Sequence, residues 1–121
     1  MFDRHDQVVR RFADACGLGA VGGLRAALHT DAVAVCDSGG QVSTAMGVVS
    51  GADDVAHLAV VLLCGQPDTE LSIEAINGRS GLALRRAGQA IAVVGVDTIG
   101  ARVAALWIVL NPAKLRGWHR S

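Results

Sequence analysis

The sequence contains no tyrosine, and its aromatic residues are limited to two phenylalanines and two tryptophans. Without tyrosine, no phenol is available to donate a proton to a developing oxyanion in an apolar site. Hydrophobic residues make up 51% of the chain and charged residues 18%, so a core can form, built mainly from Val, Leu, Ile and Ala. With 121 residues, the chain is expected to form one domain, residues 1–121.

Net charge and long hydrophobic runs are also missing. Eleven basic residues balance eleven acidic ones, so the chain lacks the positive field that autonomous nucleic-acid binding needs. The longest apolar run, residues 90–96, is far too short to cross a membrane, and the charged start of the chain does not resemble a signal peptide. We therefore expect no membrane contact and no autonomous binding of nucleic acid.

Cysteine is sparse, with three residues at wide spacing and no CxxC pair: Cys16, Cys36 and Cys64. This odd number argues against a disulfide framework and against a zinc site, and it is typical of a reducing cytoplasm. No two histidines have metal-ligand spacing, so the sequence predicts no metal, and no motif predicts a cofactor.

The first half of the chain has helical apolar spacing. Residues 4–16 predict an amphipathic helix, a short second helix follows, and residues 31–37 predict a strand. Ser50 is expected to cap a third helix that runs to residue 64. The carboxyl-terminal basic residues Lys114, Arg116, His119 and Arg120 form either a solvated turn or a docking patch for an acidic partner.

The second half predicts four strands, at residues 71–77, 81–86, 89–97 and 102–110, with turns at 87–88 and 98–100. Helices on one side of a curved antiparallel sheet give an α+β fold. The last two strands are apolar on both faces, which predicts a homodimer through the outer face of the sheet. The alternative is that their small residues leave only a modest exposed apolar surface.

Few residues are candidates for chemistry. Asp37 ends the first strand as a base or acceptor, or else it caps the following turn. Asn111, before Pro112, either orders the chain end or presents an amide to a pocket. Trp107 is a core or dimer residue or a ligand platform, and His5 lies on the apolar side of the first helix as a core-edge residue or a pocket residue.

Three segments carry a family resemblance: Asp37-Ser38-Gly39-Gly40-Gln41, Asn77-Gly78-Arg79 and Asn111-Pro112-Ala113-Lys114-Leu115. They resemble signature segments of the SnoaL-like domain at the carboxyl terminus of group-41 extracytoplasmic-function sigma factors, the J-type sigma factors of actinobacteria. In this chain Gln41 stands where that family typically has lysine, and Ala113 where it has aspartate.

The resemblance implies a cone-shaped, nuclear-transport-factor-2-like fold with an internal pocket. It also implies contact with a sigma-factor core or RNA polymerase through Asp37, Gly39, Gly40, Asn111, Pro112, Lys114 and Leu115. The wider superfamily includes cyclases, isomerases and epoxide hydrolases with acid or base groups in apolar pockets.

Three functional hypotheses follow. The first is a non-enzymatic module that binds a small apolar ligand or a protein partner, with Asp37, Arg79, Trp107, Asn111 and His5 as binding residues. The second is a small enzyme acting on an apolar carbonyl or epoxide, with Asp37 as base and Asn111 or Arg79 as orienter. A third, weaker hypothesis is a dimeric scaffold whose pocket is filled by its own side chains.

Overall fold

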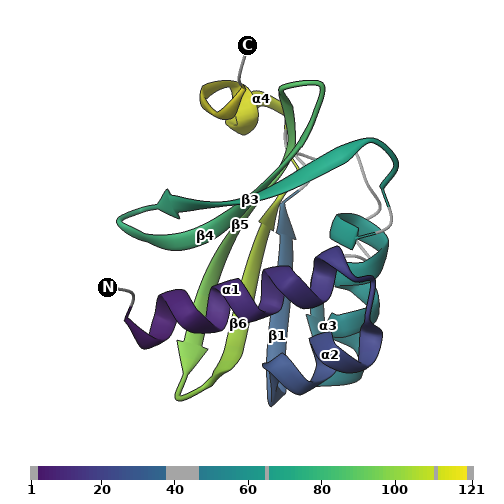
Figure 1. Ribbon diagram of the computed structural model, residues 1–121, viewed down its shortest axis with the longest axis vertical. Helices are drawn as coiled ribbons and strands as arrows, with labels where there is room; N and C mark the ends of the chain where they lie inside the picture. Colours follow the sequence, from purple (N-terminus) through teal and green to yellow (C-terminus); the bar gives the residue numbers. More distant parts are fainter. Residues whose placement is uncertain (1–2, 38–46, 65, 111, 120–121) are drawn as a thin grey trace.

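The helices and strands follow one another nearly as predicted. The computed structural model describes residues 3–37, 47–64, 66–110 and 112–119 (Figure 1). Its helical elements are α1 (Arg4–Gly17), α2 (Val21–Ala27), α3 (Ala52–Ala59), the π-helix η2 (Val60–Cys64), α4 (Pro112–Leu115) and the 3₁₀ helix η3 (Arg116–Trp118). Its strands are β1 (Leu28–Asp37), β2 (Val48–Ser50), β3 (Thr69–Ile76), β4 (Arg79–Arg86), β5 (Gln89–Ile99) and β6 (Arg102–Val109). The α+β class is confirmed.

The strands form one curved, unclosed sheet in the order β2-β1-β6-β5-β4-β3 (Figure 1). All neighbours are antiparallel except β1 and β6, which run parallel. A wholly antiparallel sheet was therefore a wrong prediction at this pair. The reason is that no hairpin joins β1 to β6, so the intervening helices and strands, rather than a tight turn, set their relative direction.

One face of the sheet carries the main core, because α1 lies across it with α2 and α3 alongside (Figure 1). Ten large side chains there are almost completely buried: Val9, Phe12, Leu24, Val55, Leu82, Leu84, Val94, Val103, Leu106 and Ile108. Because these side chains have almost no surface that water can reach, they do not line a water-accessible cavity. The internal pocket stays a prediction, and it would have to lie beyond these ten side chains.

Two hairpin turns have the left-handed backbone typical of type I′ turns. Ala87 and Gly88 have φ of 52° and 81°, which confirms the turn predicted there. Asn77 and Gly78, with φ of 53° and 84°, form the other turn, so the prediction that Asn77 continues a strand was wrong. The predicted turn at residues 98–100 was also placed too early, because β5 continues through Ile99.

The start of α3 also differs from the prediction. Ser50 pairs with Val33 as the last residue of β2, and the helix cap is Gly51. No side chain caps this helix end. Acidic residues do occupy the first turn, at Asp53 and Asp54, where their negative charges interact favourably with the positive end of the helix dipole.

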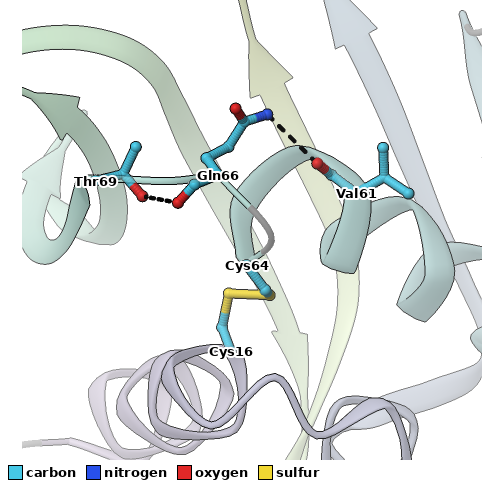
Figure 2. Close-up of a disulfide and its surroundings, with 5 residues drawn as sticks. All are labelled: Cys16, Val61, Cys64, Gln66 and Thr69. Carbon is cyan, nitrogen blue, oxygen red and sulfur yellow. Dashed lines mark hydrogen bonds between the residues drawn. A yellow bond between two sulfur atoms is a disulfide. The ribbon is translucent and has the colours of Figure 1, made fainter.

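Cys16 and Cys64 form a disulfide between the last turn of α1 and the end of η2 (Figure 2). Their Cα atoms are 5.1 Å apart, although 48 positions separate them in the sequence. The prediction against a disulfide was therefore wrong, because packing of α1 on η2 brings together two cysteines that no local spacing relates. Cys36 keeps its thiol, and burial raises its pKa.

The carboxyl-terminal segment packs on the face of the sheet opposite α1, which we call the outer face. Leu115 is buried there against Ala83, Ala90 and Val93, whose strand neighbours point into the main core. His119 Nδ1 accepts a 2.9 Å hydrogen bond from the backbone nitrogen of Ala90. The described part of the chain contains no helix that is long and apolar enough to cross a membrane.

A buried ion pair fastens the same segment. Arg85 is 8% exposed, and its guanidinium binds the carboxylate of Glu74 on the adjacent strand β3. Arg85 Nε also donates a 2.8 Å hydrogen bond to the carbonyl oxygen of Trp118 in η3. The hydrogen bond to Glu74 raises the pKa of Arg85, so the guanidinium stays charged.

Candidate functional site

The structure brings together two residues from different signature segments. Lys114 Nζ in α4 donates a 2.6 Å hydrogen bond to Asp37 Oδ2 at the end of β1, and the two residues form an ion pair. The backbone nitrogen of Leu110 also donates a 2.7 Å hydrogen bond to the Asp37 carbonyl oxygen. The alternative that Asp37 caps its own turn depends on residues 38–40, which lie outside the described residues. The predicted site residue Asn111 also lies outside them.

We name this region the docking edge and define it by Asp37, Leu110, Ala113, Lys114 and Arg116. The carboxylate side chain of Asp37 is 26% exposed and the Lys114 side chain is 62% exposed. Ala113 and Arg116 are exposed as well. The docking edge is thus an accessible surface with a basic side, and a salt bridge fixes α4 against the end of β1.

His5 lies at another place, in the first turn of α1. Its Nε2 donates to the Ser80 carbonyl oxygen at 2.9 Å. Its Nδ1 accepts from Arg79 Nη2 at 2.9 Å and from the Thr98 hydroxyl at 3.2 Å. Because both ring nitrogens are engaged, His5 joins α1 to β4 and β5 and has no nitrogen left for a substrate.

Asp6, beside His5, completes this contact between α1 and the sheet. Its carboxylate accepts a 2.5 Å hydrogen bond from the Ser80 hydroxyl and a 2.7 Å bond from Arg10 Nε. The hydrogen bond from Ser80, followed by the bond from Arg10, holds the pKa of Asp6 below its ordinary value of 3.8. Asp6 therefore stabilises the folded chain only while it is ionised.

A pH dependence of stability follows from Asp6. Since its pKa is lowered on folding, the stabilisation is present above about pH 4 and is lost as the pH falls through the folded-state pKa. We expect the free energy of unfolding to drop less steeply between about pH 4 and pH 2 in Asp6→Asn than in the unsubstituted chain. Urea denaturation at stepped pH measures this slope.

Asp14→Asn, on the exposed side of the same helix, is the matched control for that experiment. It removes the same charge from α1 without removing the bonds to Ser80 and Arg10. If Asp6→Asn and Asp14→Asn show the same acid slope, the assigned role of Asp6 is wrong.

Arg79 and Trp107 share a surface hollow of about 230 Å³ on the outer face. Trp107 is 58% exposed on β6, and Gly95 and Ala105 lie beside it. Arg79 Nη1 lies 3.4 Å from Asp97 Oδ1 at the rim. Asp97 lies within β5.

The arrangement is poor in catalytic chemistry. Asp37 is paired with Lys114, and it lines none of three surface hollows formed by described residues. His5 and Asp6 hold the helix to the sheet, and Arg79 is bonded to His5 and Asp97. Within the described ranges, no group of three or more His, Cys, Asp or Glu residues is placed to hold a metal ion.

Sequence reasoning missed some of these contacts and had signals for others. Lys114 stood in a recognised segment, but nothing local indicated Asp37 as its partner. Asn77-Gly78 is itself a strong hairpin signal, which predicts a turn as well as a family motif. Arg85 stands out as a charge within a buried strand, yet its partners Glu74 and Trp118 leave no mark in the sequence.

Comparison with solved structures identifies the fold class. The chain resembles the Mycobacterium tuberculosis extracytoplasmic-function sigma factor SigJ, with a TM-score of 0.70 and 27% identity over 96% of this chain and 45% of that one. It also resembles an NTF2-like protein of unknown function from Burkholderia pseudomallei, with a TM-score of 0.61 and 17% identity over 99% of this chain and 100% of that one. This is an NTF2-like fold, and the predicted resemblance to such proteins, a J-type sigma factor among them, is confirmed.

A third similar structure is an enzyme. The LEH-like epoxide hydrolase of M. tuberculosis matches with a TM-score of 0.57 and 14% identity over 96% of this chain and 89% of that one. At that identity the likeness concerns the fold alone. The chain spans less than half the length of SigJ, and comparison with protein-family models and with curated proteins finds no match in sequence.

Proposed function

We propose that this chain is a non-catalytic, NTF2-like regulatory module that binds the core of an extracytoplasmic-function sigma factor through the docking edge. The observation that carries the proposal is the ion pair between Asp37 and Lys114, which lie 77 positions apart in the sequence. The family resemblance implies a role in sigma-core contact for both residues. Their pairing supports the proposal because it brings the end of β1 and α4 together at one accessible surface.

Two further observations support a binding role. The similarity to SigJ extends over 96% of this chain. Arg116 is exposed beside Lys114, so the docking edge is suited to an acidic partner surface. Two departures from the family pattern count against the proposal: this chain has Gln41 in place of the usual lysine and Ala113 in place of the usual aspartate, so any contact that uses those two charges is lost. A cytoplasmic location belongs to the same proposal.

The alternative of a small enzyme with Asp37 as base is less well supported. A general base must reach the proton of a bound substrate, and Asp37 Oδ2 is instead held by an ammonium group at 2.6 Å. His5, the only histidine among the candidate residues, has both nitrogens bonded within the protein. A small apolar ligand would need the internal pocket, which remains a prediction.

Charge reversal at Lys114 tests the proposed contact. We expect Lys114→Glu to weaken binding to the isolated core of a J-type sigma factor by about tenfold, which corresponds to about 1.4 kcal/mol. The reversal both removes a basic contact and separates α4 from Asp37. Fluorescence anisotropy with a labelled sigma core measures the dissociation constant.

Arg25→Glu is the matched control, because Arg25 forms a comparably exposed ion pair with Asp53 away from the docking edge. It should leave the dissociation constant unchanged. Equal binding by Lys114→Glu and the unsubstituted chain would contradict the proposal. So would turnover of an epoxide or carbonyl substrate that is lost in Asp37→Asn.

A further inference from the structure

The disulfide between Cys16 and Cys64 joins two sulfur atoms that differ in their access to solvent. Cys16 lies in the last turn of α1 and is 2% exposed, whereas Cys64 ends η2 and is only partly buried. A thiolate that breaks a disulfide must reach one of its two sulfurs. The folded chain therefore offers Cys64, rather than Cys16, to a small-molecule thiol.

The element that Cys64 ends is weakly packed. η2 is a π-helix of five residues, a geometry that is rare in proteins and frequent at functional sites. Leu63 is buried in the main core, but Val61 is 64% exposed, and the other side chains of η2 are only partly buried. A segment with so few buried apolar contacts opens more readily than the strands of the core.

Hydrogen bonds continue from η2 to the start of β3 (Figure 2). Gln66 Nε2 donates a 3.4 Å hydrogen bond to the Val61 carbonyl oxygen, and the Thr69 hydroxyl donates a 2.9 Å bond to the Gln66 carbonyl oxygen. The bond to Val61 is long and exposed to solvent, so it contributes little stability. Among the described side-chain contacts at this end of η2, the disulfide is therefore the strongest.

The core does not depend on η2 for its large side chains. The ten almost completely buried side chains that fill the main core all come from α1, α2, α3 and the strands. Reduction leaves Cys16 in this core as a small apolar group. The domain can therefore stay folded when the link is broken, with η2 as the part that is set free.

We propose that the Cys16–Cys64 disulfide is a reversible redox switch, which a small-molecule thiol opens at Cys64 and whose reduction releases η2 from the folded domain. The observations that carry the proposal are the unequal burial of the two sulfurs and the weak packing of η2. It does not rest on the proposed sigma-factor contact, which uses the docking edge.

The switch operates by thiol–disulfide exchange. The thiolate of the small molecule attacks Cys64 Sγ, the bond between the protein sulfurs breaks, and its electron pair leaves with Cys16 Sγ, which takes up a proton. A second thiolate attacks the small-molecule sulfur of the mixed disulfide, and Cys64 Sγ leaves and takes up a proton. The protein gains two electrons and two protons, while two small-molecule thiols become one disulfide. The reverse exchange, with that disulfide as oxidant, restores the link.

Glutathione disulfide is the probe that identifies the accessible sulfur. The chain contains three cysteines, so Cys36→Ala leaves only the pair. In that background, the further change Cys16→Ala should give a mixed disulfide at least about tenfold faster than the further change Cys64→Ala, because access limits the rate. Intact-mass spectrometry follows the adduct, and circular dichroism establishes that both variants are folded. Equal rates, or a faster reaction of the chain that keeps Cys16, would overturn the assignment of Cys64.

Urea separates exchange in the folded chain from exchange in the unfolded chain. The rate at which excess dithiothreitol reduces the disulfide should change little with urea below the unfolding transition, because opening of η2 exposes little surface. A rate that rises as steeply with urea as global unfolding does would show that the link breaks only in the unfolded chain. That outcome would make the disulfide purely structural and overturn the switch.

Hydrogen exchange detects the release of η2. In the reduced chain, the amides of residues 60–64 should exchange at least about tenfold faster than in the oxidised chain, and with little dependence on urea. Amides of β5 and β6 should keep the steep urea dependence of global unfolding. The pair Cys16→Ala and Cys64→Ala is the matched control, which should show the fast exchange with or without reductant. Exchange at residues 60–64 that reduction leaves unchanged, or that glutathione disulfide does not slow again, would contradict the proposal.

Discussion

Replacing Arg85 with leucine should lower the free energy of unfolding by about 3–5 kcal/mol. Arg85 and Glu74 are both mostly buried, with side chains 9% and 13% exposed. Removing one member of a buried ion pair leaves the other charge in a site that no longer compensates it. The substitution also removes the donor to the Trp118 carbonyl oxygen, so the carboxyl-terminal segment loses one hydrogen bond to the outer face of the sheet.

Urea denaturation followed by circular dichroism measures this loss, and hydrogen exchange of residues 113–119 reports release of the segment. Arg86→Leu is the matched control, since Arg86 is exposed and bonds only to Gln66 and the Pro67 carbonyl oxygen among the contacts described. It should cost about 1 kcal/mol or less. The combined change Arg85→Leu and Glu74→Leu should recover part of the loss, because an apolar pair avoids the isolated charge. A loss in Arg85→Leu no larger than in Arg86→Leu would refute the assignment.

Reducing the disulfide between Cys16 and Cys64 should lower the free energy of unfolding by about 2–4 kcal/mol. The link closes a long loop, because the cysteines are 48 positions apart in the sequence, and so restricts the unfolded chain. Cys16 is 2% exposed, so the reduced thiol remains within the core as a small apolar group. Denaturation with and without dithiothreitol measures the difference.

A thiol count defines the starting state. The oxidised, unfolded chain should present one reactive thiol, from Cys36, and the reduced chain three. Cys36→Ala is the matched control, because it keeps the disulfide and should keep the response to reductant. The pair Cys16→Ala and Cys64→Ala should lose that response. Three reactive thiols before reduction would show that the link is absent.

The disulfide also bears on where the protein acts. Stable disulfides are rare in a reducing cytoplasm, where such links are usually transient or redox-sensing. The cysteines therefore no longer support the cytoplasmic location that the sequence suggested. A measured cost of reduction would show how far the fold depends on the redox state of its surroundings.

The helices and most strand boundaries were predictable because their signals are local. In α1, Val8, Val9 and Phe12 recur at the pitch of a helix, and all three are buried as that spacing requires. At Ala87-Gly88 the turn follows from Gly88, which adopts a positive φ without steric cost, between two apolar strands. Such patterns depend on a few neighbouring residues, so the sequence by itself determined the order of elements and the α+β class.

The candidate site was predictable only in part. Asp37, Arg79 and Trp107 were named from sequence, and Trp107 and Arg79 do share one hollow. Asp37 and His5 lie in separate contacts, with Lys114 and with Ser80 respectively. The family resemblance located the segments, but it did not contain the distances between them.

Only the tertiary structure decided which distant residues meet. The parallel pairing of β1 with β6, the Cys16–Cys64 link and the Asp37–Lys114 pair each join positions far apart in the chain. No local sequence pattern predicts these contacts, because the distances between such positions are set by how α1, α3 and the sheet pack to bury apolar surface. The sequence determined the elements through local periodicity, and packing of those elements determined the contacts that give the protein its candidate surfaces.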